Sequence, residues 1–141
     1  MTPSAVLILS GAARLDNLGD VAMLQAGVRR ARALWPQARL SVVTEAPETL
    51  SRLCPEAHAV PASGMDLWRD DALLLGGLRR LAGRRLSDSV SRAHRWAWKK
   101  APAAAEGAAR LRLAVAGSVD RGAHLSAFRD ALARAELVLV A

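Results

Sequence analysis

Apolar residues in the first 60 positions fall into two patterns, continuous runs and helical stripes. Residues 5–10 (AVLILS) form a nearly unbroken apolar run, which is typical of a parallel strand covered on both faces. Beyond it, apolar residues recur at intervals of three and four, which predicts one buried face of an α-helix that Pro36 ends. The residues of this stripe are Val21, Leu24, Val28, Ala31 and Trp35.

The same alternation continues after Pro36. Residues 39–44 (RLSVVT) are rich in β-branched side chains and predict a second strand. Residues 47–53 begin with a proline, which helices accept in their first turn, and predict a short helix. Residues 57–60 predict a third short strand. This β-α-β-α-β succession favours a parallel sheet with right-handed crossovers.

The second half of the chain predicts more helix. Residues 65–100 are expected to form two helices that break near Gly83, the second capped by Ser87 or Asp88. A connector of small residues is expected at 101–109, followed by a strand at 111–116 and a turn at 117–122. A further helix then carries Leu125, Phe128 and Leu132 on one face, and a closing strand is expected at 136–141.

These elements predict an α/β fold with a Rossmann-like parallel sheet of about five strands flanked by helices. The 141 residues are about the length of one domain, and 52% of them are apolar. We therefore expect a single domain over residues 1–141, with a basic helical insertion at about 65–110. Because the last strand reaches Ala141, we also expect a further half of the fold beyond it.

The net charge of +7 is concentrated in one segment. Residues 69–112 carry eleven Lys and Arg against four acidic residues, whereas positive and negative charges balance in the rest of the chain. Together with nearby tryptophans, such a segment is typical of an amphipathic surface that contacts anionic lipid head groups. A solvated helical face with its Trp side chains in the core is the structural alternative. The candidate contacts are Arg79, Arg80, Arg84, Arg85, Lys99 and Lys100.

Other classes of function lack their sequence signals. Cys54 is the only cysteine, and the three histidines are scattered, so no metal-ligand spacing is present and no metal is expected. No motif for specific nucleic-acid recognition is found. The sequence shows neither a signal peptide nor a run of the roughly 20 apolar residues that a membrane span needs. These features predict a cytoplasmic protein, at most peripheral at the inner face of the membrane.

The stretch DNLGD, residues 16–20, connects the first strand to the first helix. Gly19 would let the backbone turn sharply or approach a ligand, and Asn17 would hydrogen-bond a sugar hydroxyl. Asp20 is a candidate general base toward an acceptor hydroxyl, and also a candidate N-cap of the helix. In the structural alternative, Asp20 only caps the helix and Asn17 only closes an Asx-turn. The loop is not GxGxxG, and only Glu45 stands where a ribose-binding acid is expected, which excludes a dinucleotide site.

This part of the chain resembles the start of the polysaccharide pyruvyl transferase family, with its Asn-x-Gly-Asp loop between a strand and a helix. The tail AELVLVA also resembles the family's strand that leads into a glycine-rich loop. The residues that carry the resemblance in the first half are Asn17, Gly19, Asp20, Leu24, Pro36, Val42, Thr44 and Pro47.

The resemblance implies the N-terminal, acceptor-side half of a GT-B-like transferase. Such enzymes move a pyruvyl group from phosphoenolpyruvate to a sugar of a cell-surface glycan, with no cofactor besides the donor substrate. The partner would be a glycan or a lipid-linked sugar, and the donor site would lie in a C-terminal domain that this chain lacks. By this resemblance, Asp20 is the catalytic residue, and Asn17 and Gly19 bind the acceptor.

Two other interpretations stay open. Heptosyltransferase-like GT-B glycosyltransferases also begin with a strand, a Gly-Asp turn and a helix, but usually have a proline where this chain has Met23, Leu24 and Gln25. A non-catalytic module that binds anionic surfaces through residues 69–112 is the second interpretation.

Overall fold

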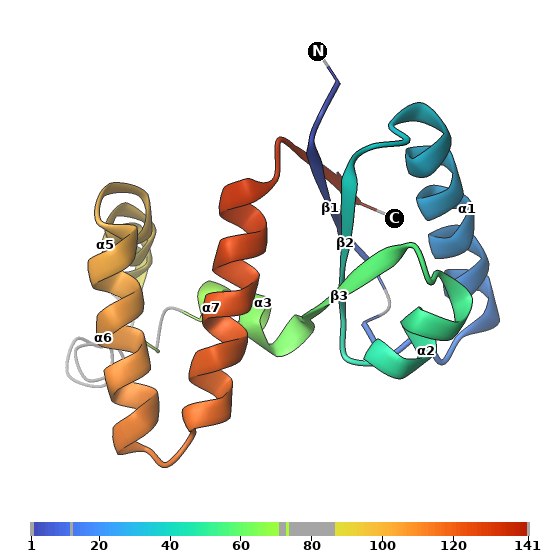
Figure 1. Ribbon diagram of the computed structural model, residues 1–141. Helices are drawn as coiled ribbons and strands as arrows, with labels where there is room; N and C mark the ends of the chain where they lie inside the picture. The colour runs from blue at the N-terminus through green and yellow to red at the C-terminus, as the bar shows by residue number, and fades with distance from the viewer. Residues whose placement is uncertain (1, 12, 71–72, 74–86, 141) are drawn as a thin grey trace.

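The structure, a computed structural model, describes residues 2–11, 13–70, 73 and 87–140 (Figure 1). Strands and helices alternate in the first half of the chain, and helices dominate the second. The elements are β1 (Ala5–Leu9), α1 (Leu18–Leu34), β2 (Arg39–Thr44), α2 (Pro47–Leu53), β3 (Ala57–Pro61), α3 (Ala62–Arg69), α5 (Ser87–Lys100), α6 (Pro102–Val115), α7 (Val119–Arg134) and β4 (Leu137–Val140).

The strands form one parallel sheet in the order β3-β2-β1-β4, so β1 has a neighbour on each side. Ile8 of β1 pairs with Val42 of β2 and with Leu139 of β4. The chain moves outward from β1 through β2 to β3, and then crosses to the other side of β1 for β4. In its described residues the protein is therefore an α/β fold of Rossmann-like type, with four parallel strands flanked by six helices.

Helices cover both faces of this sheet (Figure 1). Val6 and Ile8 of β1 belong to the core that faces α1 and α2. Leu7, between them in sequence, faces the opposite way and packs in a core with Phe128 of α7. The side chains of a strand alternate between the two faces, so an unbroken apolar run is the sequence of a strand buried on both.

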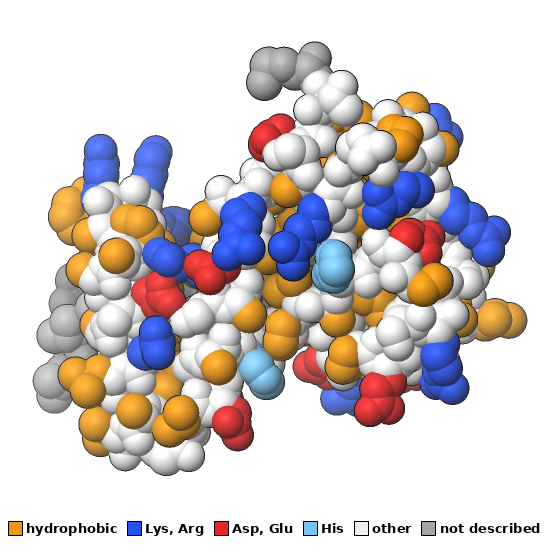
Figure 2. Space-filling model, viewed as in Figure 1, with side chains coloured by type: hydrophobic (Ala, Val, Ile, Leu, Met, Phe, Trp, Pro, Cys, Tyr) orange, Lys and Arg blue, Asp and Glu red, His pale blue; other side chains and the backbone are white. Residues whose placement is uncertain are grey.

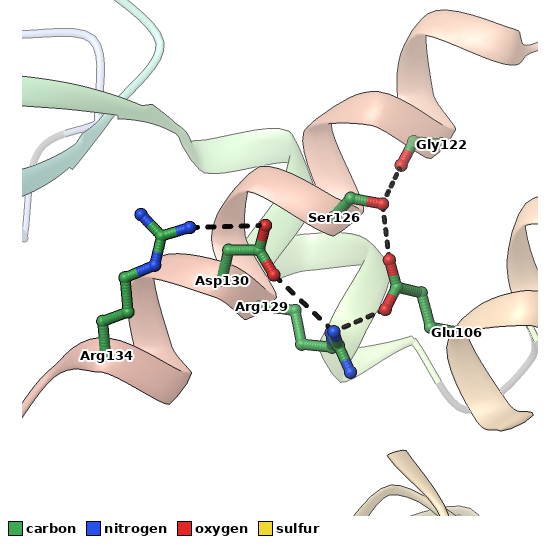
Figure 3. Close-up of polar contacts among 6 residues, drawn as sticks. All are labelled: Glu106, Gly122, Ser126, Arg129, Asp130 and Arg134. Atoms are coloured by element: carbon green, nitrogen blue, oxygen red, sulfur yellow. Dashed lines mark hydrogen bonds and ion pairs between the residues drawn. The ribbon is translucent and has the colours of Figure 1, made fainter. Parts of the chain in front are cut away.

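A further helical layer lies outside α7 (Figure 1). Here α5 and α6 pack against α3 and α7 through their own apolar cluster, which includes Trp98, Leu113 and Leu125. Glu106 of α6 is also buried, and Arg129 of α7 compensates its charge across a 2.6 Å ion pair (Figure 3). Ser126 donates a 2.6 Å hydrogen bond to the other carboxylate oxygen of Glu106. The carboxylate of Glu106 thus joins α6 to α7.

The strands predicted for residues 5–10, 39–44, 57–60 and 136–141 are confirmed, as are the helices that carry Leu24 and Leu125. The strand expected at residues 111–116 is wrong, because these residues continue α6, and the connector expected at 101–109 forms most of the same helix. The described sheet therefore has four strands and not about five. The break expected near Gly83 lies outside the described residues.

The error at α6 has a physical cause. Leu111, Leu113 and Val115 alternate with other residues as in a strand, but only Leu113 is buried. Its buried partners are Ala105 and Ala109, which precede it at intervals of four, the period of a helix face. The preceding residues are largely alanine, the strongest helix former, so propensity and burial both favour the helix.

The turn expected at residues 117–122 is shorter in the structure and joins two helices, because α7 already begins at Val119. Gly117 has a φ of 71°, in the left-handed region that glycine adopts without strain. Its N–H donates to the carbonyl of Ala114, and the N–H of Ser118 donates to the carbonyl of Leu113. This pair of hydrogen bonds is the Schellman arrangement that ends helices at a glycine. In the described part of the chain, no helix is long and apolar enough to cross a membrane.

Substitution by alanine should change the free energy of unfolding in opposite directions at two helical glycines, Gly107 and Gly64. Gly107 of α6 is exposed, and a Cβ added there meets no heavy atom within 4 Å. We expect Gly107→Ala to raise the free energy of unfolding by about 0.5–1 kcal/mol, because alanine loses less conformational entropy in a helix. Urea unfolding followed by circular dichroism measures this change.

Gly64 of α3 provides the matched contrast. A Cβ at this position would collide with the backbone carbonyl of His124 and lie 2.9 Å from the Cβ of Phe128, because α3 and α7 approach closely here. Gly64→Ala should therefore lower the free energy of unfolding by about 1–3 kcal/mol or more. Similar effects of the two substitutions would contradict this packing.

Candidate functional site

The loop that follows β1 lies at the edge where all parallel strands end. Its described residues are 10, 11 and 13–17, and it leads into α1. The chain goes from β1 to β2 and β3 on one side and then to β4 on the other side of β1, so the strand order reverses between β1 and β4. In open α/β sheets, ligands bind outside the carboxyl ends of the strands at such a point.

Asn17, and not Asp20, is the N-cap of α1. Its backbone is extended, and its Oδ1 accepts a 2.9 Å hydrogen bond from the N–H of Gly19. The helix begins at Leu18, which makes Asp20 its third residue. The prediction that Asp20 caps the helix is therefore wrong, because Asn17, an equally good capping residue, precedes it and has the extended backbone of an N-cap. Asp20 instead places a partly exposed carboxylate in the first turn, where negative charge is favourable.

Gly19 does not form a sharp turn. It lies within α1, and Gly117 is the only described glycine with positive φ. A Cβ at Gly19 would touch only Asn17 Oδ1, at 3.5 Å. The backbone here is exposed and open to solvent, so a ligand can approach it, but the fold does not require glycine.

The strained residue of the loop is Leu15, which the sequence does not reveal. Its φ is 54°, although its side chain has a Cβ, and only 6% of its surface is exposed. Left-handed backbone at a bulky residue costs free energy and persists only where the surroundings fix it. Burial of Leu15 in the core beside α1 supplies that constraint and fixes the loop immediately before Asp16 and Asn17.

Thr44, at the end of β2, holds the same loop from the other side. Its buried hydroxyl donates a 2.8 Å hydrogen bond to the carbonyl of Ala13 and accepts one of 3.0 Å from the N–H of Ala46. The N–H of Glu45 donates to the same carbonyl at 2.7 Å. Arg14 and Glu45 add an exposed ion pair at 3.4 Å, which contributes little. The loop after β1 is thus joined to the end of β2 by hydrogen bonds around the buried Thr44 hydroxyl.

A cavity of about 380 Å³ opens at the carboxyl ends of β2 and β3. Its apolar wall includes Pro47 and Pro61, and its polar groups include Glu45. Ser63 and His124, from α3 and α7, also line it, and Ser63 Oγ and His124 Nδ1 share a 2.8 Å hydrogen bond. Figure 2 shows the surface hollowed between α7 and α2. No sequence motif indicates a role for His124, because its partner Ser63 lies 61 residues away.

Of the predicted site residues, the structure brings Asn17, Gly19 and Asp20 together in the first turn of α1. Lys99 and Lys100 are exposed at the end of α5, in the outer helical layer and away from this loop (Figure 1). Arg79, Arg80, Arg84 and Arg85 lie outside the described residues.

The described residues contain neither a cluster of metal ligands nor an activated thiol. No cluster of three His, Cys, Asp or Glu side chains occurs there. Cys54 is buried beneath α1, and burial, with a smaller effect of the Glu56 carboxylate, raises the pKa of its thiol. A thiol with a raised pKa is a poor nucleophile, and Cys54 acts as a small apolar core residue.

In comparisons with known proteins, no family model matches this chain, and neither a curated protein nor a solved structure matches it. The candidate site is therefore described by its own geometry.

The capping role of Asn17 predicts a specific pattern of substitutions. Asn17→Ala should lower the free energy of unfolding by about 1 kcal/mol, because the N–H of Gly19 loses its acceptor. Asn17→Asp retains an oxygen at that position and should stay close to wild type. Urea unfolding of both variants checks this, and equal losses for Ala and Asp would contradict the cap.

Proposed function

We propose that this chain is the acceptor-binding half of a GT-B-like transferase, of the polysaccharide pyruvyl transferase type. One observation supports the proposal above the others: the DNLGD loop leaves β1 at the carboxyl edge of the sheet, beside β4, where the strand order reverses. This is the position at which α/β sheets bind small ligands. The Asn-x-Gly-Asp pattern that resembles the family thus coincides with a position suited to substrate.

Asp20 is assigned the role of general base in this proposal. Its carboxylate is partly exposed in the first turn of α1, so an acceptor hydroxyl can reach it. Gly19 leaves the adjacent backbone open for close approach of a sugar. Asn17 uses Oδ1 for the cap, which leaves its side-chain NH₂ group to donate to the acceptor.

The transfer itself combines a pair of sugar hydroxyls with phosphoenolpyruvate. Both hydroxyl oxygens become bonded to the central carbon of the enolpyruvyl group, and phosphate leaves. One hydroxyl proton ends on the methylene carbon, which becomes a methyl group, and the other leaves with phosphate. Asp20 would accept a proton as the first hydroxyl attacks. The donor is held by a second half of the enzyme in this proposal, so this chain contributes acceptor binding and the base.

The heptosyltransferase-like alternative gives Asp20 the same role and differs in the donor. In that case a nucleotide sugar would replace phosphoenolpyruvate, and no ketal would form. Phosphate release that depends on phosphoenolpyruvate, measured with the donor half supplied, separates the two.

Asp20→Asn should weaken acceptor binding by this chain. We expect amide shifts at Gly19, Asp20 and Val21 when a ¹⁵N-labelled sample is titrated with a panel of methyl glycosides. Loss of a hydrogen bond to a charged group should reduce the affinity about tenfold or more. With the donor half supplied, the rate of transfer should fall by about a hundredfold to ten-thousandfold.

Asp16→Asn is the matched control, because Asp16 is an exposed carboxylate in the same loop but lies before the first turn of α1. It should bind and transfer like the wild type. Unchanged transfer in Asp20→Asn would show that the base assignment is wrong, and equal effects of both variants would point to net charge alone.

A further inference from the structure

The outer face of α5 gathers cations around an exposed tryptophan. Trp96 is 64% exposed, and every charged side chain described on this helix is basic and exposed. The spacing of three, one, three and one residues along the helix places all of them within one broad face. These residues are Arg92, Arg95, Trp96, Lys99 and Lys100.

The opposite face of α5 fixes this orientation. Trp98 is only 8% exposed and packs in the cluster shared with α6 and α7. His94 is 4% exposed, and its Nε2–H donates a 3.1 Å hydrogen bond to the carbonyl of Trp68. His94 and Trp98 also meet edge to face, with ring centroids 6.2 Å apart. Because these contacts hold the helix, Trp96 cannot turn inward, and it stays in solvent beside the cations.

The charge on this face is not neutralised within the described part of the protein. Its four cations form no ion pair there, and Arg92 donates only to the hydroxyl of Ser89, at 3.1 Å. Figure 2 shows Lys and Arg side chains projecting from the top of the outer helical layer, where α5 ends and α6 begins. Two cations elsewhere are used internally: Arg32 donates to the carbonyls of Pro36, Ala38 and Glu56, and Arg129 pairs with Glu106.

We propose that this face of α5 docks on an anionic lipid bilayer. Its lysines and arginines match the negative surface potential of such a bilayer. Trp96 matches its interface, where an indole places its apolar ring among the acyl chains and its N–H among the head groups. A tryptophan surrounded by cations on a firmly packed helix favours lipid over nucleic acid, since the helix presents no strand or loop for stacking successive bases. This surface is independent of the acceptor site at the sheet edge.

Flotation of the full chain with vesicles tests the proposal. Vesicles of phosphatidylcholine alone should not bind the chain, and vesicles with about a third phosphatidylglycerol should bind it at low salt and release it at high salt. Arg95→Gln with Lys99→Gln should lower the apparent affinity about tenfold or more, because each cation near the surface adds to binding. Trp96→Ala should weaken binding without changing its dependence on salt.

Two controls match these variants. Arg29→Gln with Arg30→Gln removes the same charge from exposed positions on α1, and Leu111→Ala removes an exposed apolar side chain from α6. Both should bind vesicles like the wild type. The proposal is overturned if the anionic vesicles do not bind, or if the α1 and α5 charge variants lose affinity equally. It is also overturned if the α5 variant loses affinity for a single-stranded RNA but not for vesicles.

Discussion

The burial of β1 on both faces is the constraint on which the rest of this structure depends. Val6, Leu7 and Ile8 are at most 1% exposed, so helices must cover the sheet on each side of this strand. Parallel neighbours on both of its edges require crossovers in both directions. As a consequence, the loop after β1 opens at the point where the strand order reverses, and buried contacts of Leu15 and Thr44 fix it there.

The outer helices depend on the same sheet through α7. Phe128 of α7 packs on the sheet, while Leu125 of the same helix packs outward against α5 and α6. Gly64 lets α3 approach α7 closely enough for Ser63 to reach His124 beside the cavity. The sheet therefore positions two separate surfaces, the carboxyl edge through its loops and the basic face of α5 through a layer of helices.

Much of this arrangement could be predicted from the sequence, because burial imposes a period. The short apolar run at residues 5–10 fits a strand buried on both faces, and the stripe from Val21 to Trp35 fits one helix face; the structure has both elements. Residues 111–116 match two periods, since Leu111, Leu113 and Val115 alternate as in a strand, while Leu113 also continues a helical stripe from Ala105 and Ala109. The alanine-rich residues before this segment favour the helix, and packing against α7 adds a preference that the alternation of residues 111–116 does not contain.

The candidate site shows the same division between local and tertiary information. The sequence located the DNLGD loop after β1, but Asn17 and Asp20 are both good capping residues, and only the extended backbone of Asn17 decides between them. The contacts of Thr44 with Ala13 and of Ser63 with His124 join residues distant in sequence, so the spacing of residues along the chain does not predict them.

Amide hydrogen exchange, measured by NMR on wild type and Thr44→Val, tests the central claim that hydrogen bonds around the Thr44 hydroxyl hold the loop after β1 to the end of β2. In the wild type the amides of Glu45 and Ala46 should be protected, because they donate to Ala13 O and Thr44 Oγ1. In Thr44→Val both should exchange at least about tenfold faster, as expected when a hydrogen bond worth about 1.5 kcal/mol is lost, while Leu7 and Ile8 in β1 stay protected. Rapid exchange of Glu45 and Ala46 in the wild type, or protection unchanged by the substitution, would contradict this role of Thr44.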